Sequence, residues 1–384
     1  MNKRAIAILG GVFILIVATL GVIIYLRSRN TATTVQDQPT TPDVVVEDPT
    51  TEDPTDNPNP DDPQTPSTNQ ATKLTDEGVL SPALYFSGDG IAYFNTSGEL
   101  FRTSMSISDK TVLLSNKTKL SVPQKPGIST ILWPKVGSSY ITESGTGTIK
   151  QWSYYNPSSG QYVDLPGQVK SLSWMPNGDK IMFVWVGNDG MASLNISNPD
   201  TTGYQMLTDL YEPDNVISVS PDGQLVLFYR TQTSDMTKNT INSVSPDGKV
   251  FNTIIREGYN KGVLWSPDSK KFLFRKLDPS SGKFNLWFAD LSTGDVRNLN
   301  IATSETKAVW TKDGQSIVVA VPTSGTVGEG ITSDTFYKLD IYTNARTEFG
   351  PGIAVDAREL FLSLDNNTLF FKNAQDNALY YLPL

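Results

Sequence analysis

The chain has 384 residues, of which 38% are apolar, and this is enough for a sizeable core in one large domain or two ordinary ones. It contains no cysteine and no histidine, which excludes disulfides, Cys/His zinc sites, thiol nucleophiles and imidazole bases. The net charge is −9 and lysine and arginine form no cluster, so we expect no nucleic-acid partner.

The N-terminal segment has the length and composition of a membrane anchor. Residues 5–26 are uncharged and mostly apolar, and as a helix they would span about 33 Å against a hydrocarbon core of about 30 Å. A cleaved signal peptide is the alternative, but such peptides have shorter apolar regions and a small-x-small cleavage site, which is not found here. We therefore expect residues 1–30 to form a signal anchor with one transmembrane helix, which makes the membrane the partner of residues 5–26.

Residues 31–72 form an acidic linker that also bears on the orientation of the anchor. They hold eight prolines and nine carboxylates, and they bury too little apolar surface to offset chain entropy, so we expect a disordered, extended stalk. The charges that flank the helix nearly balance, because Lys3 and Arg4 face Arg27 and Arg29. A polar stalk leading to a folded domain is typical of an exported segment, so we expect residues 73–384 on the extracytoplasmic side of the cell membrane.

Beyond residue 75 one pattern recurs seven times at intervals of about 45 residues. Each copy has an apolar residue, a turn rich in Ser, Pro, Asp and Gly, and then apolar residues at alternate positions, which predicts a β-hairpin with one buried face. The seven copies are Phe86-Ser-Gly-Asp-Gly90, Trp133-Pro-Lys-Val-Gly137, Trp174-Met-Pro-Asn-Gly178, Val219-Ser-Pro-Asp-Gly223, Trp265-Ser-Pro-Asp-Ser269, Trp310-Thr-Lys-Asp-Gly314 and Leu362-Ser-Leu-Asp-Asn366.

A second hairpin follows each copy, so each repeat contains four strands, and this is the signature of a propeller blade. We predict an all-β, seven-bladed β-propeller over residues 73–384, with six blades as the alternative. Tandem β-sandwiches would need repeats of about 100 residues. Four of the seven tryptophans stand before the turn, and their even spacing predicts packing between neighbouring blades. The last copy lacks a fourth strand, so residues near 73–79 should close the ring as the outer strand of blade seven.

The repeat resembles a known class of propeller. Trp-Ser-Pro-Asp-Gly with a following apolar strand, then Leu-Trp-x-x-Asp-Leu-x-Thr-Gly, is similar to the TolB-type, WD-like repeat of many exported bacterial proteins, most closely at residues 263–299 and 219–228. The resemblance implies the fold and says little about function. It departs from TolB in having a membrane anchor in place of an α/β domain, and in its seven blades where TolB has six.

The connections between second and third strands are longest in blades four, five and six, at residues 231–240, 276–283 and 322–335. They predict a loop-rich sector on one face, where a protein or glycan partner would bind. The candidate ligand-binding residues on or near these connections are Arg230, Tyr259, Lys261, Arg275, Lys276 and Glu329. No metal-ligand set and no cofactor motif is found, so we expect none.

These observations favour a membrane-anchored extracytoplasmic propeller that acts as a protein- or ligand-binding or scaffolding module. No catalytic motif is evident, so we do not expect an enzyme. The alternative is a propeller enzyme, a carboxylate-based hydrolase or lyase acting on an envelope or extracellular substrate, which would need paired Asp or Glu residues from different blades. A passive structural component of an envelope complex is a third interpretation.

Overall fold

The computed structural model describes residues 70–384, apart from residues 86, 147–148, 231–238, 257, 259, 279 and 328–329. The expected transmembrane helix at residues 5–26 lies outside this part, as does the linker up to residue 69. Within the described part, no helix is long and apolar enough to cross a membrane. The anchor, its orientation and the domain boundaries therefore stay predictions.

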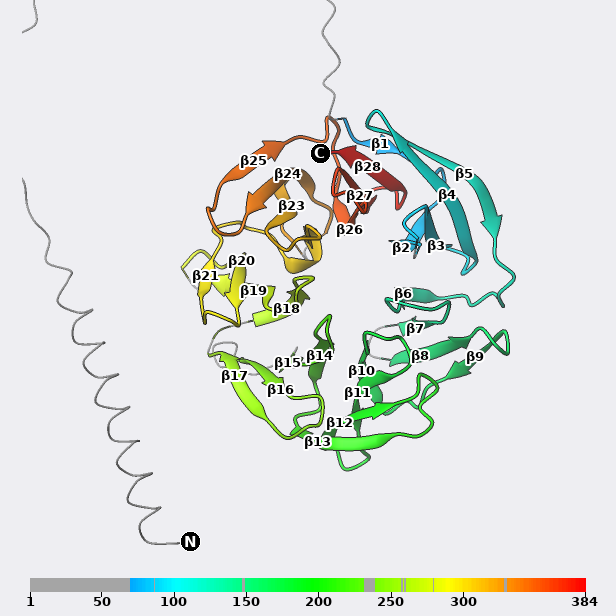
Figure 1. Ribbon diagram of the computed structural model, residues 1–384, viewed down its shortest axis with the longest axis vertical. Coiled ribbons are helices and arrows are strands. Elements are labelled where there is room, and N and C mark those ends of the chain that lie inside the picture. The colour runs from blue at the N-terminus through cyan, green and yellow to red at the C-terminus, as the bar shows by residue number, and fades with distance from the viewer. Residues whose placement is uncertain are drawn as a thin grey trace, which may run out of the picture. The chain divides into compact units, whose positions relative to one another are not determined.

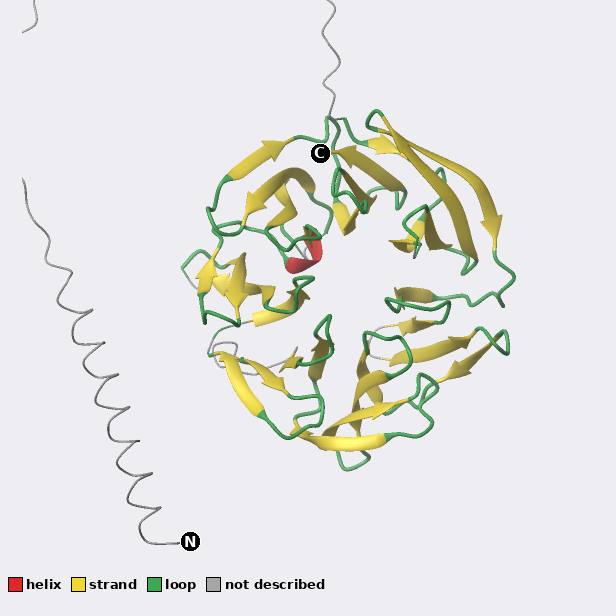
Figure 2. Cartoon of the chain, in the orientation of Figure 1, coloured by secondary structure: helices red, strands yellow, loops and turns green. Residues whose placement is uncertain are grey.

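Seven four-stranded sheets are arranged around a central axis, as Figure 1 shows. Six of them contain four consecutive strands in sequence order, and neighbouring strands are antiparallel. Strands account for almost all the regular structure, with one short helix near the centre (Figure 2). The described chain is thus an all-β, seven-bladed β-propeller, as the repeat predicts, and the six-bladed alternative is wrong.

Each blade begins with its innermost strand (Figure 1). Blade 1 consists of β2 (Val79–Leu84), β3 (Gly90–Asn95), β4 (Leu100–Ser108) and β5 (Thr111–Lys119), and blade 2 of β6 (Ile128–Leu132), β7 (Tyr140–Thr146), β8 (Ile149–Asn156) and β9 (Gln161–Asp164). Blade 3 consists of β10 (Val169–Trp174), β11 (Ile181–Val186), β12 (Ala192–Ser197) and β13 (Gln205–Tyr211), and blade 4 of β14 (Asn215–Val219), β15 (Val226–Arg230), β16 (Ile241–Val244) and β17 (Phe251–Ile255).

The last three blades include the ring closure. Blade 5 consists of β18 (Asn260–Trp265), β19 (Lys271–Asp278), β20 (Lys283–Asp290) and β21 (Val296–Asn298). Blade 6 consists of β22 (Ala308–Trp310), β23 (Ser316–Ser324), β24 (Ser333–Asp340) and β25 (Arg346–Phe349). Blade 7 consists of β26 (Ala357–Leu362), β27 (Thr368–Asn373), β28 (Leu379–Pro383) and β1 (Thr72–Lys73). The 3₁₀-helix η1 (Glu305–Lys307) directly precedes β22.

The antiparallel order places the connections on two faces. The turns between the first and second strands and between the third and fourth strands lie on one face, which we call the turn face. The connections between the second and third strands, and those from one blade to the next, lie on the opposite face, which we call the loop face. The seven repeated turns therefore form a ring on the turn face, and η1 belongs to the loop face.

The N-terminal strand closes the ring, as predicted. Thr72 pairs with Tyr381 and Lys73 with Tyr380, so that β1 is the outer strand of blade 7. The contact continues past the strand, because the Leu74 N–H donates to the Leu379 carbonyl at 2.8 Å. This arrangement covers the free edge of the C-terminal strand β28.

The first copy of the repeat lies two residues earlier than the sequence pattern suggests. Leu84 pairs with Ile91, and the Gly88 N–H donates to the Tyr85 carbonyl at 2.7 Å, as Gly223 does to Ser220 in blade 4. The turn glycine is therefore Gly88, whose φ is 73°, and not Gly90, which begins β3. The assignment of Phe86-Ser-Gly-Asp-Gly90 was wrong because two glycines stand two residues apart in this turn.

The core lies between the blades, where the faces of adjacent sheets meet. The second strands are its most buried elements, and β27 is buried along its whole length. Four tryptophan side chains that precede the repeated turns donate an Nε1–H bond to a carbonyl of the preceding blade, at 2.8–3.3 Å. These bonds confirm the predicted packing between blades and join Trp133 to Ser81, Trp174 to Leu132, Trp265 to Ser218 and Trp310 to Leu264.

Candidate functional site

Three of the predicted ligand-binding residues are described with their side chains, and each has a partner within the chain. Arg230 lies 2.8 Å from Asp214 through its Nε atom. The Nε atom of Arg275 lies 3.6 Å from Glu305, and the ammonium of Lys276 lies 4.8 Å from the centre of the Trp287 ring.

The structure does not bring these three residues together in one pocket. Arg275 and Lys276 are consecutive in β19, so their side chains point to opposite sides of the sheet. Tyr259, Glu329 and the side chain of Lys261 lie outside the described residues. The expected long connection at residues 276–283 is also shorter than predicted, because β19 and β20 extend into it and leave only residues 279–282 between them. The ligand-binding role of all six residues stays a prediction.

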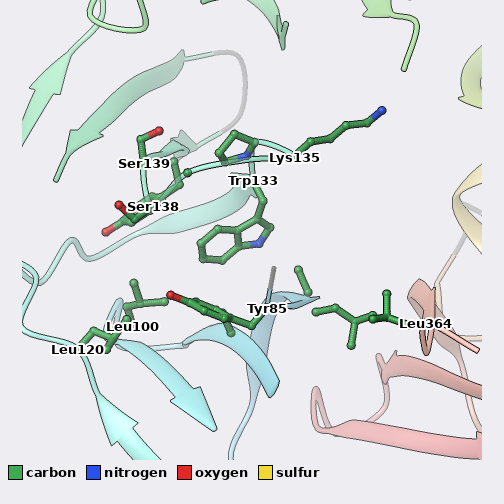
Figure 3. Close-up of a pocket in the computed structure, with 14 residues that line it drawn as sticks. Tyr85, Leu100, Leu120, Trp133, Lys135, Ser138, Ser139 and Leu364 are labelled. Atoms are coloured by element: carbon green, nitrogen blue, oxygen red, sulfur yellow. The ribbon is translucent and has the colours of Figure 1, made fainter. Parts of the chain in front are cut away.

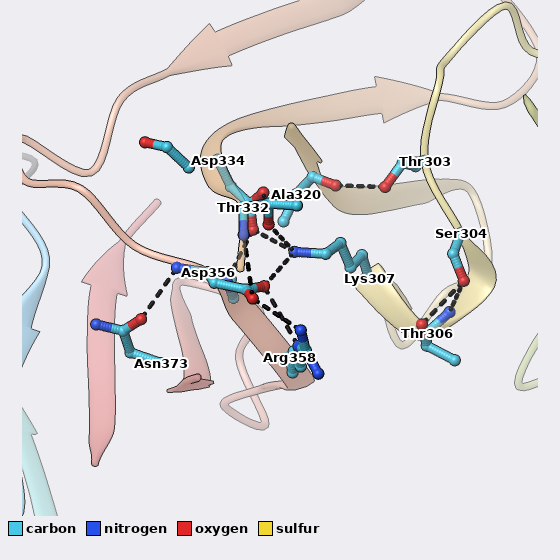
Figure 4. Close-up of polar contacts among 12 residues, drawn as sticks. Thr303, Ser304, Thr306, Lys307, Ala320, Thr332, Asp334, Asp356, Arg358 and Asn373 are labelled. Carbon is cyan, nitrogen blue, oxygen red and sulfur yellow. Dashed lines mark hydrogen bonds and ion pairs between the residues drawn. The ribbon is translucent and has the colours of Figure 1, made fainter. Parts of the chain in front are cut away.

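A buried ionic cluster on the loop face joins blades 6 and 7 (Figure 4). The Lys307 ammonium, from η1, lies 2.5 Å from Asp334 and 2.7 Å from Asp356, and it also donates to the Thr332 hydroxyl at 2.9 Å. Both carboxylate side chains have no exposed surface. Arg358 pairs with Asp356 at 2.8 Å, so two cations neutralise two carboxylates.

The ionisation of this cluster does not suit acid–base chemistry. Burial alone would raise the pKa of Asp356, but hydrogen bonds from Arg358 and Lys307 outweigh it and lower that pKa to about 2. Glu305, at the other end of η1, has a pKa raised by burial, although the nearby Arg275 opposes this. Among the described residues, no three carboxylates gather in a way that could hold a metal ion.

A pocket of about 330 Å³ lies on the turn face between blades 1 and 2. Its walls are mainly apolar and aromatic, and Figure 3 shows Trp133 on one side of the pocket and Tyr85 on the other. Ser138 and Ser139 form a polar end to one side of these rings, and the Lys135 side chain points to the opposite side (Figure 3). This volume lies at the lower end of the range for small-molecule sites. The residues that line it are Ala83, Leu84, Tyr85, Ala92, Leu100, Leu120, Trp133, Pro134, Lys135, Gly137, Ser138, Ser139, Tyr140 and Leu364.

The pocket exists because the repeated turn of blade 2 does not close. In the other six blades the first residue of the turn donates its N–H to a carbonyl five residues later, at 2.7–2.9 Å. These donors are Tyr85, Met175, Ser220, Ser266, Thr311 and Ser363. In blade 2 this position is Pro134, which has no N–H and cannot make the bond.

The open turn also loses its contact with the preceding blade. In the other six blades the residue at the glycine position touches the neighbouring turn; a Cβ on Gly223, for example, would lie 3.0 Å from Pro176. Ser269 and Asn366 replace glycine in two blades and accept backbone hydrogen bonds from the preceding turn. A Cβ on Gly137 would meet no described atom within 4 Å. The space between the turns of blades 1 and 2 is therefore left open.

A positive charge lies on the side of the pocket opposite to Ser138 and Ser139 (Figure 3). The ammonium of Lys135 donates to the Pro221 carbonyl of blade 4 at 2.8 Å, so it extends toward the channel and away from the Trp133 ring (Figure 3). Burial lowers the pKa of Lys135, and the nearby Asp222 partly opposes this. On the other side, the Arg102 guanidinium stacks over the Tyr85 ring at 3.6 Å.

The sequence contained a signal for this pocket that the prediction of a loop-face site missed. In Trp133-Pro134 the proline follows the tryptophan directly, whereas in Trp265-Ser266-Pro267 it comes one residue later. In blade 5 the proline is the second residue of the turn, where it is favoured, whereas in blade 2 it is the first residue. The turn of blade 2 therefore lacks the N–H group that closes the other turns. The pocket also lies on the opposite face from the predicted sector.

No protein-family model matches the chain, and no curated protein matches it in sequence. Among solved structures, oligogalacturonate lyase from Vibrio parahaemolyticus is similar with a TM-score of 0.59 and 9% identity over 83% of this chain and 94% of that one. The β-propeller domain of Cps50 (Swd1) from Myceliophteria thermophila has a TM-score of 0.56 and 10% identity over 82% and 99%. TolB from Acinetobacter baumannii has a TM-score of 0.43 and 15% identity over 82% and 79%.

These likenesses define the class of the protein by its fold alone. The chain is a seven-bladed β-propeller, of an architecture that a lyase and a WD-type propeller domain also have. At such low identity, neither activity nor partner follows from the shared fold.

Proposed function

We propose that this protein is a membrane-anchored binding module that presents a propeller on the extracytoplasmic side of the cell membrane. The pocket between blades 1 and 2 receives an apolar group of its ligand. One observation carries the proposal: a preformed, mainly apolar pocket stays open at the turn of blade 2, which among the described residues lacks the closing hydrogen bond that the other six repeated turns make. Apolar pockets with a few polar groups at the edge are the usual form of ligand sites.

The enzyme alternative receives less support from the charged groups. Asp334 and Asp356 come from different blades and contact the same ammonium, so they are the kind of close carboxylate pair that a hydrolase or lyase would need. They are fully buried and neutralised by Lys307 and Arg358, which leaves them no access to a substrate. We therefore place the function in binding.

Blocking the pocket tests this proposal. Ser138 is exposed at its polar end, and Ser138→Trp should fill the opening without disturbing the core. Gln315→Trp changes the equivalent exposed position of blade 6 and serves as the control. In crosslinking of the full chain in its native membrane, a ligand bound in the pocket is lost with Ser138→Trp and kept with Gln315→Trp. Equal capture by both variants would place binding elsewhere on the molecule.

The extracytoplasmic location is tested separately by thiol labelling. The chain has no cysteine of its own, so an introduced cysteine is the single target of the label. Ser158→Cys introduces one thiol at an exposed turn of blade 2. A membrane-impermeant maleimide should label this thiol in intact cells, or after the outer permeability barrier is opened where one exists. Labelling that requires lysis of the inner membrane would mean that the propeller is cytoplasmic.

A further inference from the structure

We infer that the pocket between blades 1 and 2 recognises a peptide segment in which a large apolar side chain stands beside a carboxylate. The inference rests on the proposed binding function and names the chemistry of its ligand. It combines three observations on the described residues: preformed apolar walls, an ammonium on the channel side of the pocket, and backbone N–H groups that donate to no backbone carbonyl.

The apolar walls are preformed. The Trp133 indole is held by its hydrogen bond to Ser81 at 2.8 Å, and its ring centre lies 5.4 Å from that of Tyr140 and 6.1 Å from that of Phe94. Tyr85 is covered by Arg102, which does not itself line the pocket. Walls that are already fixed lose little conformational entropy on binding, so one large apolar side chain can be bound without rearrangement.

The charge lies next to this apolar space and favours an acidic neighbour. Lys135 lines the pocket and directs its ammonium toward the channel, where its partner is a neutral carbonyl. The acid that influences it, Asp222, already accepts hydrogen bonds from Ser220 and from the backbone of Gln224.

The open turn offers what a peptide backbone needs. In the part of the chain that the structure describes, the N–H groups of Val136, Gly137 and Ser138 donate to no backbone carbonyl. An extended segment that places its side chain between Trp133 and Tyr85 brings its own carbonyl groups to this turn. The ligand is therefore a peptide whose apolar residue enters the pocket and whose adjacent acidic residue approaches Lys135.

Three short probes separate these contributions in a titration followed by ligand-observed NMR with the full chain in detergent. They are Ac-Phe-Glu-NH₂, Ac-Phe-Gln-NH₂ and Ac-Ala-Glu-NH₂. We expect the Phe-Glu probe to bind about threefold more tightly than the Phe-Gln probe at low salt, and the difference to shrink as the salt concentration rises. The Ala-Glu probe should bind too weakly to detect.

Two variants assign the selectivity to Lys135. Lys135→Met should abolish the preference for Glu over Gln while keeping the binding of Phe. Lys312→Met changes the equivalent turn position of blade 6, where the turn is closed, and should leave the preference unchanged. Equal binding of the Glu and Gln probes to the wild type would overturn the inference and leave the binding function standing. If no probe binds, and the Ser138→Trp variant still captures the ligand in the crosslinking experiment as the wild type does, both the peptide inference and the proposed binding pocket would be overturned.

Discussion

At the scale of single residues, Pro134 and Lys307 show how one side chain determines a local structure. Pro134 removes one N–H donor, and the space between the turns of blades 1 and 2 stays open on the turn face. Lys307 does the reverse on the loop face, where it joins carboxylates from two blades in a closed, neutral cluster. A small chemical difference at each position therefore decides whether the propeller presents a pocket or a sealed surface.

Replacing Lys307 should strongly destabilise the propeller. Lys307→Met would leave Asp334 and Asp356 buried with one cation fewer, and breaking a buried ion pair in this way costs about 3–5 kcal/mol. Urea unfolding followed by tryptophan fluorescence measures the change. The exposed Lys312→Met should change the free energy of unfolding by less than about 0.5 kcal/mol. Similar values for the two variants would contradict the structural role of the cluster.

The same cluster predicts a specific acid sensitivity. The pKa of Asp356 in the folded chain, about 2, lies below its ordinary value of 3.8. Its ionised form therefore stabilises the fold fully above its unfolded pKa, and this contribution is lost as the pH falls toward 2. Asp356→Asn removes the titration, so its free energy of unfolding should decline less than that of the wild type between about pH 4.5 and pH 2.5. Parallel curves for the two proteins in urea titrations would refute this assignment.

At the scale of the elements, the joints between blades depend on hydrogen bonds as well as on apolar packing. The tryptophans before the repeated turns place an indole N–H against a carbonyl of the blade before. The sequence pattern predicts the position of these rings, because an apolar residue before a turn must pack on something. It does not predict the bonds, because they depend on how closely two sheets approach.

These bonds can be tested by a substitution that keeps an aromatic ring. Trp174→Phe removes the 2.9 Å bond to the Leu132 carbonyl, leaves that carbonyl without its partner and should cost about 1–3 kcal/mol. Trp152→Phe is the control, since its buried Nε1 has no hydrogen-bond partner among the described residues. Trp152→Phe breaks no hydrogen bond and loses only ring volume, so it should destabilise the fold less than Trp174→Phe in the same unfolding experiment. An equal loss in both variants would show that ring volume alone matters.

The outer strand β1 should contribute to the stability of the whole domain. Deletion of residues 71–74 removes this strand, the buried Ala71 and the bond from Leu74 to Leu379, and it exposes the edge of β28. Calorimetry should show a lower melting temperature for the entire propeller transition. Deletion of residues 58–61, four positions of the predicted linker, should leave it unchanged. A melting temperature unaffected by the first deletion would mean that the ring does not need this closure.

At the scale of the whole molecule, the repeat predicts the architecture because seven similar units must bury the same faces against one another. Blade number, strand number and ring closure follow from that regularity. The sequence pattern places the first copy two residues too late, because Gly88 and Gly90 both fit a turn. The pairing of Leu84 with Ile91 in the structure identifies Gly88 as the turn residue. The pocket could not be predicted from the regularity, since it arises where the regularity fails, at Pro134. Connection length predicts the loop-face residues, but it does not report the internal pairing of Arg230 or Arg275.

The closure by β1 also determines how the propeller would respond to mechanical tension. A force applied to the chain ahead of Gln70 reaches the fold at Ala71, whose N–H donates to the Pro351 carbonyl at 2.8 Å, and then at Thr72 and Lys73. The partners of Thr72 and Lys73 are Tyr381 and Tyr380 of the C-terminal strand. The same few contacts thus hold the ring shut and carry the load. A propeller attached in this way would yield first at the seam of blade 7, and the remaining six blades would keep their four strands each when that seam opens.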